Sequence, residues 1–209
     1  MAIAHHPDIS TLMTCAAGSH PESLSAVVAS HLSVCPDCCR KVSQLSRIGV
    51  TLFERLEPIQ LVEKMPRPDG LERAVPQTSR NPRTDRDLEI PAPLQCILGS
   101  SLDHLPWQTA SKGIEQVVVA LSPRTTGELR LLRIAPNATL RSSSRGFSQL
   151  LMVLRGSYSN DGFSFHPGDL NEVAEAAEHT IMANPVTGCI VLAASDREPF
   201  VLNNVLKPE

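Results

Sequence analysis

A histidine and two cysteines lie close together in the pattern His31-x3-Cys35-x2-Cys38. Imidazole nitrogen and thiolate sulfur are the ligands that zinc prefers, in tetrahedral sets of four. The two cysteines can fill two corners of a tetrahedron from one tight turn, and His31 can reach the third. A fourth ligand is available near the N-terminus, where His5 and His6 are both candidates. The sequence therefore predicts a zinc site made by His6 or His5 together with His31, Cys35 and Cys38.

Other interpretations of the same residues stay open. A Cys-x-x-Cys pair is also found as a redox couple or as two buried thiols, and His31 could be an ordinary, partly buried helix residue. Cys39, which directly follows the motif, is expected to be a packing residue or a spare thiol rather than a fifth ligand. Four protein ligands leave no open position for a substrate, so the predicted site is structural rather than catalytic.

Three short helices within residues 1–57 are expected to position these ligands. Asp8 can cap a first helix that ends at Gly18. Pro21 suits the first turn of a second helix, which carries His31 on its apolar side near its end. Pro36 begins a third helix with Cys38 in its first turn, where the helix dipole favours a thiolate. Because so small a unit buries little apolar surface, zinc can supply the missing stability.

The composition of the 209 residues is that of a folded protein, with 42% apolar residues, 20% charged residues and a net charge of -3. Residues 1–57 contain four basic and five acidic side chains. We therefore do not expect the positive surface of a nucleic-acid-binding domain. We expect no signal peptide, because no basic region is followed by an apolar run. No stretch approaches the about 18 apolar residues of a membrane span. A cytoplasmic protein with reduced thiols is therefore expected.

The rest of the chain divides at a proline-rich stretch, residues 58–92, which we interpret as a linker. Beyond it, short apolar segments alternate with turns that are rich in Gly, Pro, Asn and Asp, which is typical of an all-β sandwich or barrel. Residues 93–209 are thus expected to form a second domain, against which Trp107 packs. The expected strands are 114–121, 128–134, 149–154, 170–173, 180–183 and 189–194.

The N-terminal pattern resembles the zinc-binding anti-sigma domain and, more closely, the ChrR-type cytoplasmic anti-sigma factors. The resemblance rests on the ligand order from His6 to Cys38, on Ala16-Ala17-Gly18 and on the run from Val28 to Ser33. It covers nearly the whole chain, because such proteins carry a second domain of the cupin type, a double-stranded β-helix barrel. It implies that the helical domain binds an extracytoplasmic-function (ECF) sigma factor, blocks its access to core RNA polymerase and releases it on an oxidative stress signal.

The cupin resemblance also makes a prediction about a second metal. In cupins a first motif supplies two histidines and a glutamate, and a second motif supplies a third histidine, which His179 matches. The first motif should fall within residues 140–150, which contain neither histidine nor carboxylate. Serine, arginine and Gln149 cannot replace those ligands. We therefore predict that the cupin domain binds no metal, although Arg141 and Arg145 could favour an anionic ligand.

Two functions from different classes remain to be compared. The favoured one is a regulatory protein that acts by sequestering a sigma factor, in which Leu24, Val28, Leu45 and Leu52 divide between the core and the partner. The alternative is a cupin-family metal-dependent enzyme, a dioxygenase or isomerase, with an N-terminal zinc module. The enzyme needs an open metal site, for which the sequence lacks ligands. Cys96 and Cys189 are expected to be structural thiols rather than redox reporters.

Overall fold

The computed structural model of the chain describes residues 3–57, 89–123, 125, 127–143, 148–173, 178–197 and 203–204. The three expected N-terminal helices are confirmed, and Pro36 begins the third of them, as predicted. Three short helical segments lie between these helices and the first strand. The helical elements are α1 (Ile9–Ala16), α2 (Glu22–Val34), α3 (Pro36–Glu54), η2 (Ala92–Leu94), α4 (Gln95–Leu98) and η3 (Leu102–His104).

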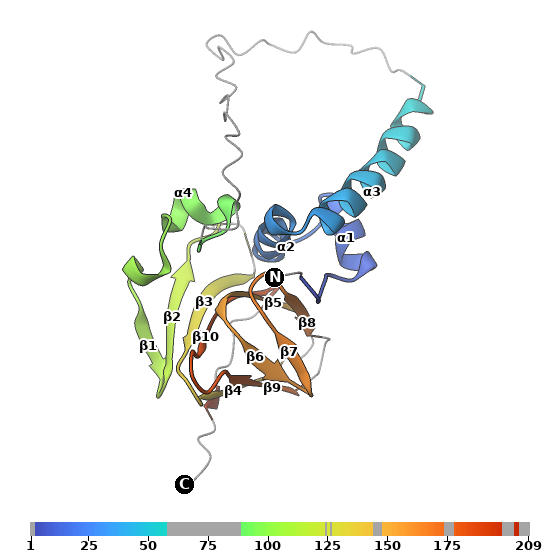
Figure 1. The fold of residues 1–209 in the computed structure, drawn as a ribbon. Helices are drawn as coiled ribbons and strands as arrows, with labels where there is room; N and C mark the ends of the chain where they lie inside the picture. The colour runs from blue at the N-terminus through green and yellow to red at the C-terminus, as the bar shows by residue number, and fades with distance from the viewer. Residues whose placement is uncertain are drawn as a thin grey trace.

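Two antiparallel sheets form a β-sandwich below the helices (Figure 1). The first sheet has the order β1-β2-β3-β10-β5-β8 and the second has the order β11-β4-β9-β6-β7. The strands are β1 (Gln108–Ser111), β2 (Ile114–Val119), β3 (Glu128–Ile134), β4 (Thr139–Ser143), β5 (Gln149–Gly156), β6 (Tyr158–Asn160), β7 (Phe163–Phe165), β8 (Leu170–Val173), β9 (Glu178–Ala183), β10 (Cys189–Ser195) and β11 (Asn203–Asn204).

All six expected strands are present, and the all-β class is confirmed. The sequence did not reveal β1, β4, β6, β7 and β11, which are at most five residues long. Strands β6 and β7 form a hairpin whose turn residues Asp161 and Gly162 both have positive φ. Three-residue strands are too short to show an alternation of apolar and polar side chains.

The central strands of the six-stranded sheet carry apolar side chains on both faces. Leu132 and Val191 point between the two sheets, into a core that also contains Tyr158 and Ile181. Leu131 and Leu192, which alternate with them, point to the opposite face and belong to a second core. Strand β10 is therefore buried along its whole length.

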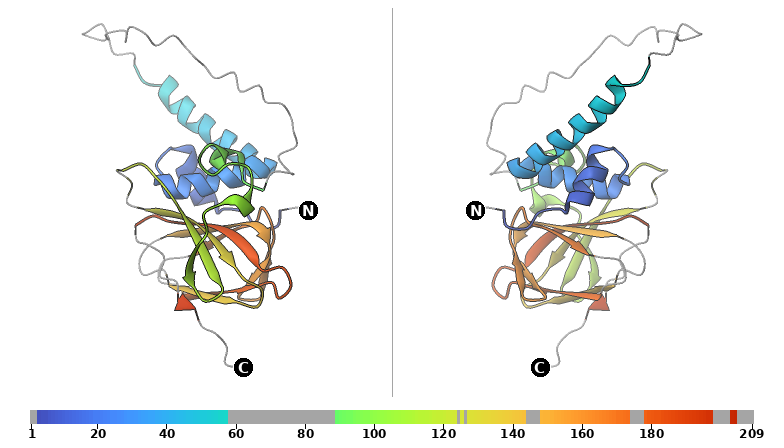
Figure 2. Two further views of the ribbon diagram at one scale, coloured as in Figure 1. Left: turned by 90° about the vertical axis from the view of Figure 1, so that its left-hand side faces the viewer. Right: turned by 90° about the vertical axis from the view of Figure 1, so that its right-hand side faces the viewer.

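Helix α2 covers this outer face, so the helices and the β-sandwich share a core. Its residues Leu24, Val27 and Val28 are at most 4% exposed and lie in one cluster with Leu131 and Leu192. The helix lies against the sandwich in all views, whereas α3 projects away from it (Figures 1 and 2). Burial of a helix stripe against a sheet is the dominant stabilising term for such a contact.

Polar contacts fix the N-terminal end of α2 on the sandwich. The buried Ser23 hydroxyl donates to the Ser195 carbonyl at 2.7 Å. The Glu22 carboxylate accepts from the Ser122 backbone N–H at 3.1 Å and from the Thr125 hydroxyl at 2.7 Å. Residue 127 has to be glycine, because a Cβ there would collide with the Ser195 carbonyl and the Ser23 hydroxyl.

The chain returns to α2 after residues 58–88, the larger part of the predicted linker, which lie outside the described residues. Ile90 and Leu94 are buried in the core beneath α2. Trp107 packs against the same core, as expected, and its indole N–H donates to the Leu102 carbonyl at 2.9 Å. The segment that begins at Glu89 is thus part of the folded body.

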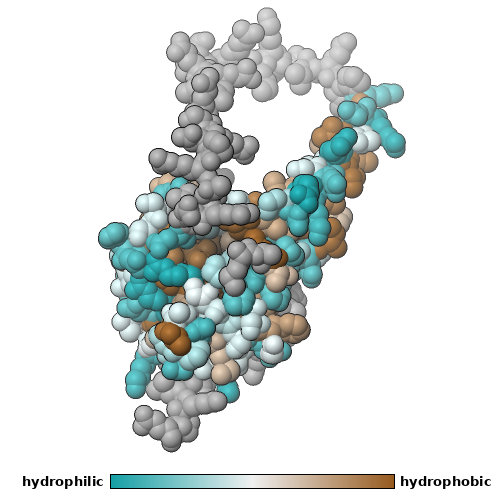
Figure 3. Space-filling model, viewed as in Figure 1, coloured by the Kyte–Doolittle hydropathy of each residue, from teal (hydrophilic) through white to brown (hydrophobic). Residues whose placement is uncertain are grey.

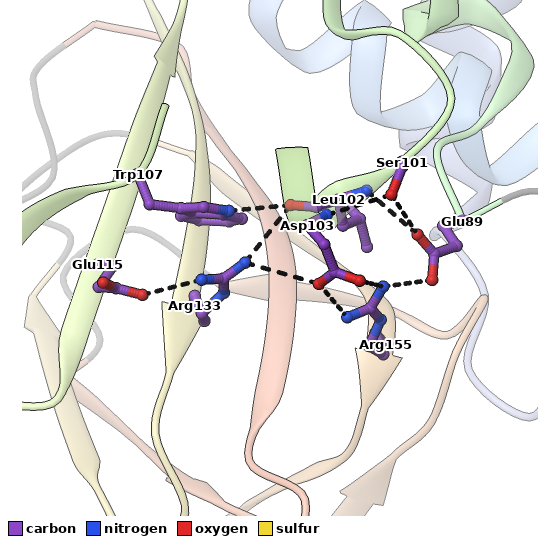
Figure 4. A network of polar contacts seen from close by, with 8 residues as sticks. All are labelled: Glu89, Ser101, Leu102, Asp103, Trp107, Glu115, Arg133 and Arg155. Atoms are coloured by element: carbon purple, nitrogen blue, oxygen red, sulfur yellow. Dashed lines mark hydrogen bonds and ion pairs between the residues drawn. The ribbon is translucent and has the colours of Figure 1, made fainter. Parts of the chain in front are cut away.

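An ion-pair network holds this returning segment to the sheet (Figure 4). The Arg155 guanidinium on β5 pairs with the carboxylates of Glu89 and Asp103, the latter at 2.8 Å. The neighbouring Arg133 on β3 pairs with Glu115 at 3.1 Å and stacks over the Trp107 ring at 4.1 Å. Arg155 thereby joins the start of the returning segment to the η3 turn.

We expect Arg155→Met to destabilise the fold near neutral pH and much less in acid. The hydrogen bond from Arg155 lowers the pKa of Asp103, and the Leu102 N–H together with Arg155 lowers the pKa of Glu89. Carboxyls with a lowered folded-state pKa stabilise the fold above their usual values of 3.8 and 4.5, and this stability is lost as the pH falls below them. Urea-unfolding midpoints at about pH 7 and about pH 3 measure the effect. Arg47→Met, an exposed site on α3, is the control, and an equal loss at both pH values would contradict the prediction.

Candidate metal centre

Four ligand-type side chains converge where the N-terminal segment, α2 and α3 meet. They are His6, His31, Cys35 and Cys38, and one donor atom from each lies within 4.8 Å of the others. His6 comes from the extended segment before α1 and His31 from the last turn of α2. Cys35 is the residue between α2 and α3, and Cys38 lies in the first turn of α3. The local fold therefore brings together the residues that the spacing pattern singled out.

The sulfur–nitrogen distances in this cluster suit a metal ion with tetrahedral coordination. His6 Nδ1 lies 3.4 Å from the Sγ atoms of both Cys35 and Cys38. A Zn–N bond of about 2.0 Å and a Zn–S bond of about 2.3 Å at the tetrahedral angle separate the two donors by about 3.5 Å. The observed distances thus agree with the spacing that a shared zinc ion requires.

His31 presents an unused lone pair to the cluster. The residue is completely buried, and its Nδ1 lies 2.9 Å from the Gly168 carbonyl, so Nδ1 carries the proton and donates it. Its Nε2 is buried and has no hydrogen-bond partner among the described residues. Burial lowers the pKa of His31 to about 4, so the ring is neutral at pH 7. A neutral imidazole with a buried free nitrogen is the form that binds a metal ion.

The two thiols are close enough to disfavour ionisation unless a cation is present. Burial, and then the hydrogen bond and charge of Cys35, raise the pKa of Cys38 to about 12. Without a cation the thiol form of Cys38 is therefore favoured, although its place in the first turn of α3 predicted a thiolate. A divalent ion reverses the balance, because it deprotonates a coordinating thiol outright. Two sulfur and two nitrogen donors form a set that zinc prefers and that the ion fills completely.

The structure separates the two N-terminal histidines. His5 faces away from the cluster: its Nδ1 lies 3.3 Å from Asp169 Oδ2, and its ring packs at a tilt of 35° against Phe165, with a centroid distance of 4.3 Å. His6 is the one that joins the cysteines. Cys39 is exposed and outside the cluster.

The structure describes only some of the residues considered for a second site. His179 lies on β9 opposite Ser142, but the side chains of both lie outside the described residues, as does Arg145. Arg141 is exposed, and the buried core between the sheets is lined by apolar side chains. The absence of a cupin metal stays a prediction. Cys189 is buried, and burial raises the pKa of its thiol to about 12, whereas Cys96 is exposed.

Two residues next to the cluster were not anticipated from the sequence. Gly168 and Asp169 lie in the turn between β7 and β8, which the sequence indicated only as a turn. Burial by itself raises the pKa of the Asp169 carboxyl, but hydrogen bonds from the backbone N–H groups of His166, His5 and Ala4 hold it below its usual range. An aspartate beside a glycine is common in turns, so the pattern carried no signal of this contact.

Comparison with known proteins shows similarity to an anti-sigma factor over almost the whole chain. The chain is 32% identical to the anti-sigma-E factor ChrR of Cereibacter sphaeroides, over 99% of this chain and 95% of the relative. It is also similar to the crystal structure of Rhodobacter sphaeroides SigE in complex with the anti-sigma ChrR. That match has a TM-score of 0.74 and 31% identity and covers 93% of this chain and all of the other. A cupin-2 domain from Rhodospirillum rubrum matches 47% of this chain and 68% of its own, with a TM-score of 0.38 and 19% identity. No family model matches the chain.

These matches agree with the main expectations from the sequence. The relative of known function is a regulatory protein and aligns with almost the whole chain, which confirms the expectation of a regulator rather than an enzyme. The helices and the β-sandwich are both included, because the solved complex covers 93% of this chain. The chain belongs to the ChrR family of anti-sigma factors.

Proposed function

We propose that this protein binds an ECF-type sigma factor and keeps it from core RNA polymerase. The observation that carries the proposal is the full-length similarity to ChrR, which was crystallised in complex with SigE. Sequestration needs no covalent chemistry, only a surface that competes for the sigma factor. We further propose that release follows an oxidative signal and that the protein acts in the cytoplasm. None of the helices in the described part of the chain combines the length and hydrophobicity needed to span a bilayer.

The surface that suits a sigma factor is the outer half of α3. Ile48, Leu52 and Phe53 lie in α3, and Leu56 follows two residues after the helix ends at Glu54. The four side chains are between 59% and 75% exposed, with spacings of four residues from 48 to 52 and of three residues from 53 to 56. We call these four residues the α3 stripe. It continues the row of Leu45, which packs against the core, onto the part of the helix that projects from the body (Figures 1 and 3). An apolar row that begins in a core and continues without cover is typical of a protein-binding face.

The exposed fractions of Leu24, Val28, Leu45 and Leu52 indicate which of them pack in the core and which are free to contact the sigma factor. Leu24 and Val28 lie in the shared core, and Leu45 is half-buried against it. Leu52 is 62% exposed and belongs to the α3 stripe. We therefore assign Leu52 to the sigma factor and the other three to the fold.

We propose that His6, His31, Cys35 and Cys38 hold one zinc ion. The ion would cross-link the N-terminal segment to the junction of α2 and α3, and so fix the direction in which α3 projects. The chain's own residues contribute a neutral imidazole at His31 and two closely spaced thiols. Because four donors complete the coordination, the role is structural.

A charge on the α3 stripe should weaken binding of the sigma factor. We expect Leu52→Glu and Phe53→Glu each to weaken binding by about 30-fold or more, since losing a central apolar anchor costs about 2 kcal/mol or more. The measurement is titration calorimetry of the full chain with the ECF sigma factor captured by it from native lysate. Arg47→Glu is the control, because Arg47 is exposed on the same helix and no stripe residue lies three or four positions from it.

Two results would count against this assignment. Unchanged affinity in both stripe variants would show that α3 is not the contact surface. Capture of no sigma factor by the wild-type chain would overturn the proposed function itself.

Loss of either cysteine should remove zinc and sigma binding together. We expect Cys35→Ser and Cys38→Ser to lower the zinc content from one ion per chain to none, because a neutral hydroxyl binds transition metals weakly. Sigma binding should fall with it, because α3 is no longer held in place. Atomic absorption and calorimetry measure the two effects, with Cys39→Ser as the control because its thiol is exposed and outside the cluster. Full inhibition by a zinc-free variant would show that the metal is not needed for binding.

The oxidative signal has its own test. Thiolate ligands are the groups of the proposed site that oxidants attack. We expect an organic hydroperoxide to dissociate the complex of the full chain with its sigma factor, as followed by size-exclusion chromatography. A complex that survives treatment would remove this part of the proposal and leave sequestration intact.

A further inference from the structure

We infer that the turn 166–170 of the β-sandwich is the outer shell of the metal centre and that Asp169 is a positioning residue for it. Metal binding and attachment of the N-terminal segment to the sandwich would then be one coupled event. The inference rests on the proposed zinc site. Its evidence lies in three contacts between that turn and the segments that carry His6 and His31.

The first contact orients His31. The Gly168 carbonyl accepts the Nδ1 proton of this histidine at 2.9 Å. A metal-binding histidine commonly donates its other ring N–H to such a partner, which fixes both the tautomer and the plane of the ring. Here the acceptor, the Gly168 carbonyl, belongs to the β-sandwich and not to the helices. The β-sandwich therefore orients the His31 ring so that Nε2 faces the cysteines.

The second contact fixes the residue before His6. The Asp169 side chain is 2% exposed, and its Oδ1 accepts from the N–H groups of Ala4 at 2.7 Å and His5 at 3.1 Å. Its Oδ2 lies 3.3 Å from His5 Nδ1. The His5 carbonyl in turn accepts from the Leu170 N–H at 3.2 Å. The backbone of His5 is thus held on both sides, and this holds His6 toward the cysteines.

The third feature is the close fit of the turn to the N-terminal segment. Gly168 has a φ of +93°, and a Cβ at this position would lie 2.9 Å from Ile3 Cγ1. The absence of a side chain therefore lets the turn approach the segment closely enough for the hydrogen bonds of Asp169 to form.

Coupling of this kind is reciprocal. If the turn strengthens zinc binding, zinc must strengthen the attachment of the N-terminal segment to the turn by the same free energy. The β-sandwich would therefore contribute to the metal affinity of the helical part although it supplies no ligand.

The first test measures zinc release from the full chain after loading with one zinc ion. Asp169→Asn retains the shape of the side chain but removes its charge and one acceptor oxygen. Losing an outer-shell partner lowers metal affinity about 10- to 100-fold. We expect this loss to appear in the rate, so that zinc passes to a colorimetric chelator faster than in the wild type by a similar factor. Glu22→Gln is the matched control, because it weakens the contact between α2 and the sandwich at the opposite end of the helix. This control should release zinc at the wild-type rate.

The second test begins with the wild-type chain, so it stands even if Asp169→Asn does not fold. Hydrogen exchange of the wild-type chain with and without zinc should show slower exchange at the amides of Ala4, His5 and Leu170 when zinc is bound. Gly168→Ala, which forces the turn away from Ile3, should reduce this protection.

The outcomes separate this inference from the proposed zinc site. A wild-type chain that binds no zinc would overturn both. A wild-type chain that binds zinc, with no zinc-dependent protection and with Asp169→Asn equal to the wild type, would overturn only the coupling. Equally fast release from Glu22→Gln and Asp169→Asn would show a general loosening of the interface and would also refute a specific role of the turn.

Discussion

The structure depends on a sheet that is apolar on both faces. Strands β3, β5 and β10 place Leu129, Leu150 and Ile190 on the outer side and a second set of aliphatic side chains on the inner side. Each fully buried aliphatic side chain of this size stabilises the fold by about 1.5–3 kcal/mol relative to exposure. A sandwich of this kind cannot leave its outer face in water, and α2 is the element that covers it. The helical part is therefore a layer of the β-fold rather than an appendage to it.

The position of α2 determines where the candidate metal centre forms. Its first residues are fixed by Glu22 and Ser23, and its last turn brings His31 to the carbonyl of Gly168. The cysteines follow directly, and α3 starts between them. Because Cys35 and Cys38 are at the base of α3, the direction of that helix follows from the same packing. The sheet thus positions α2, α2 positions the metal cluster, and the cluster lies at the base of the helix that carries the α3 stripe.

Much of the site could be predicted from the sequence because its ligands are close together along the chain. The spacing of His31, Cys35 and Cys38 reflects a helix end followed by a helix start, which are local features with clear signals. The choice between His5 and His6 could not be made, because adjacent residues of an extended segment point to opposite sides. Which one faces the cysteines is decided by Asp169, a contact that no local pattern can reveal. The longer strands were also predictable, because an apolar run bounded by turn residues is a local signal. The run from Cys189 to Ala194 gave no indication, however, of which element covers the second face of its strand.

The contact between Ala4 and Asp169 also has a consequence for biogenesis, because it spans 165 positions of the chain. The helices leave the ribosome first, yet the turn that orients His31 and His6 is synthesised more than a hundred residues later. A nascent helical segment must therefore remain incomplete while the strands are made, with its cysteines and the apolar stripe of α2 uncovered. Long-range contacts of this kind slow folding, since the entropy of closing the loop is lost before the contact contributes. Maturation of the metal cluster would then wait until the turn between β7 and β8 has been synthesised.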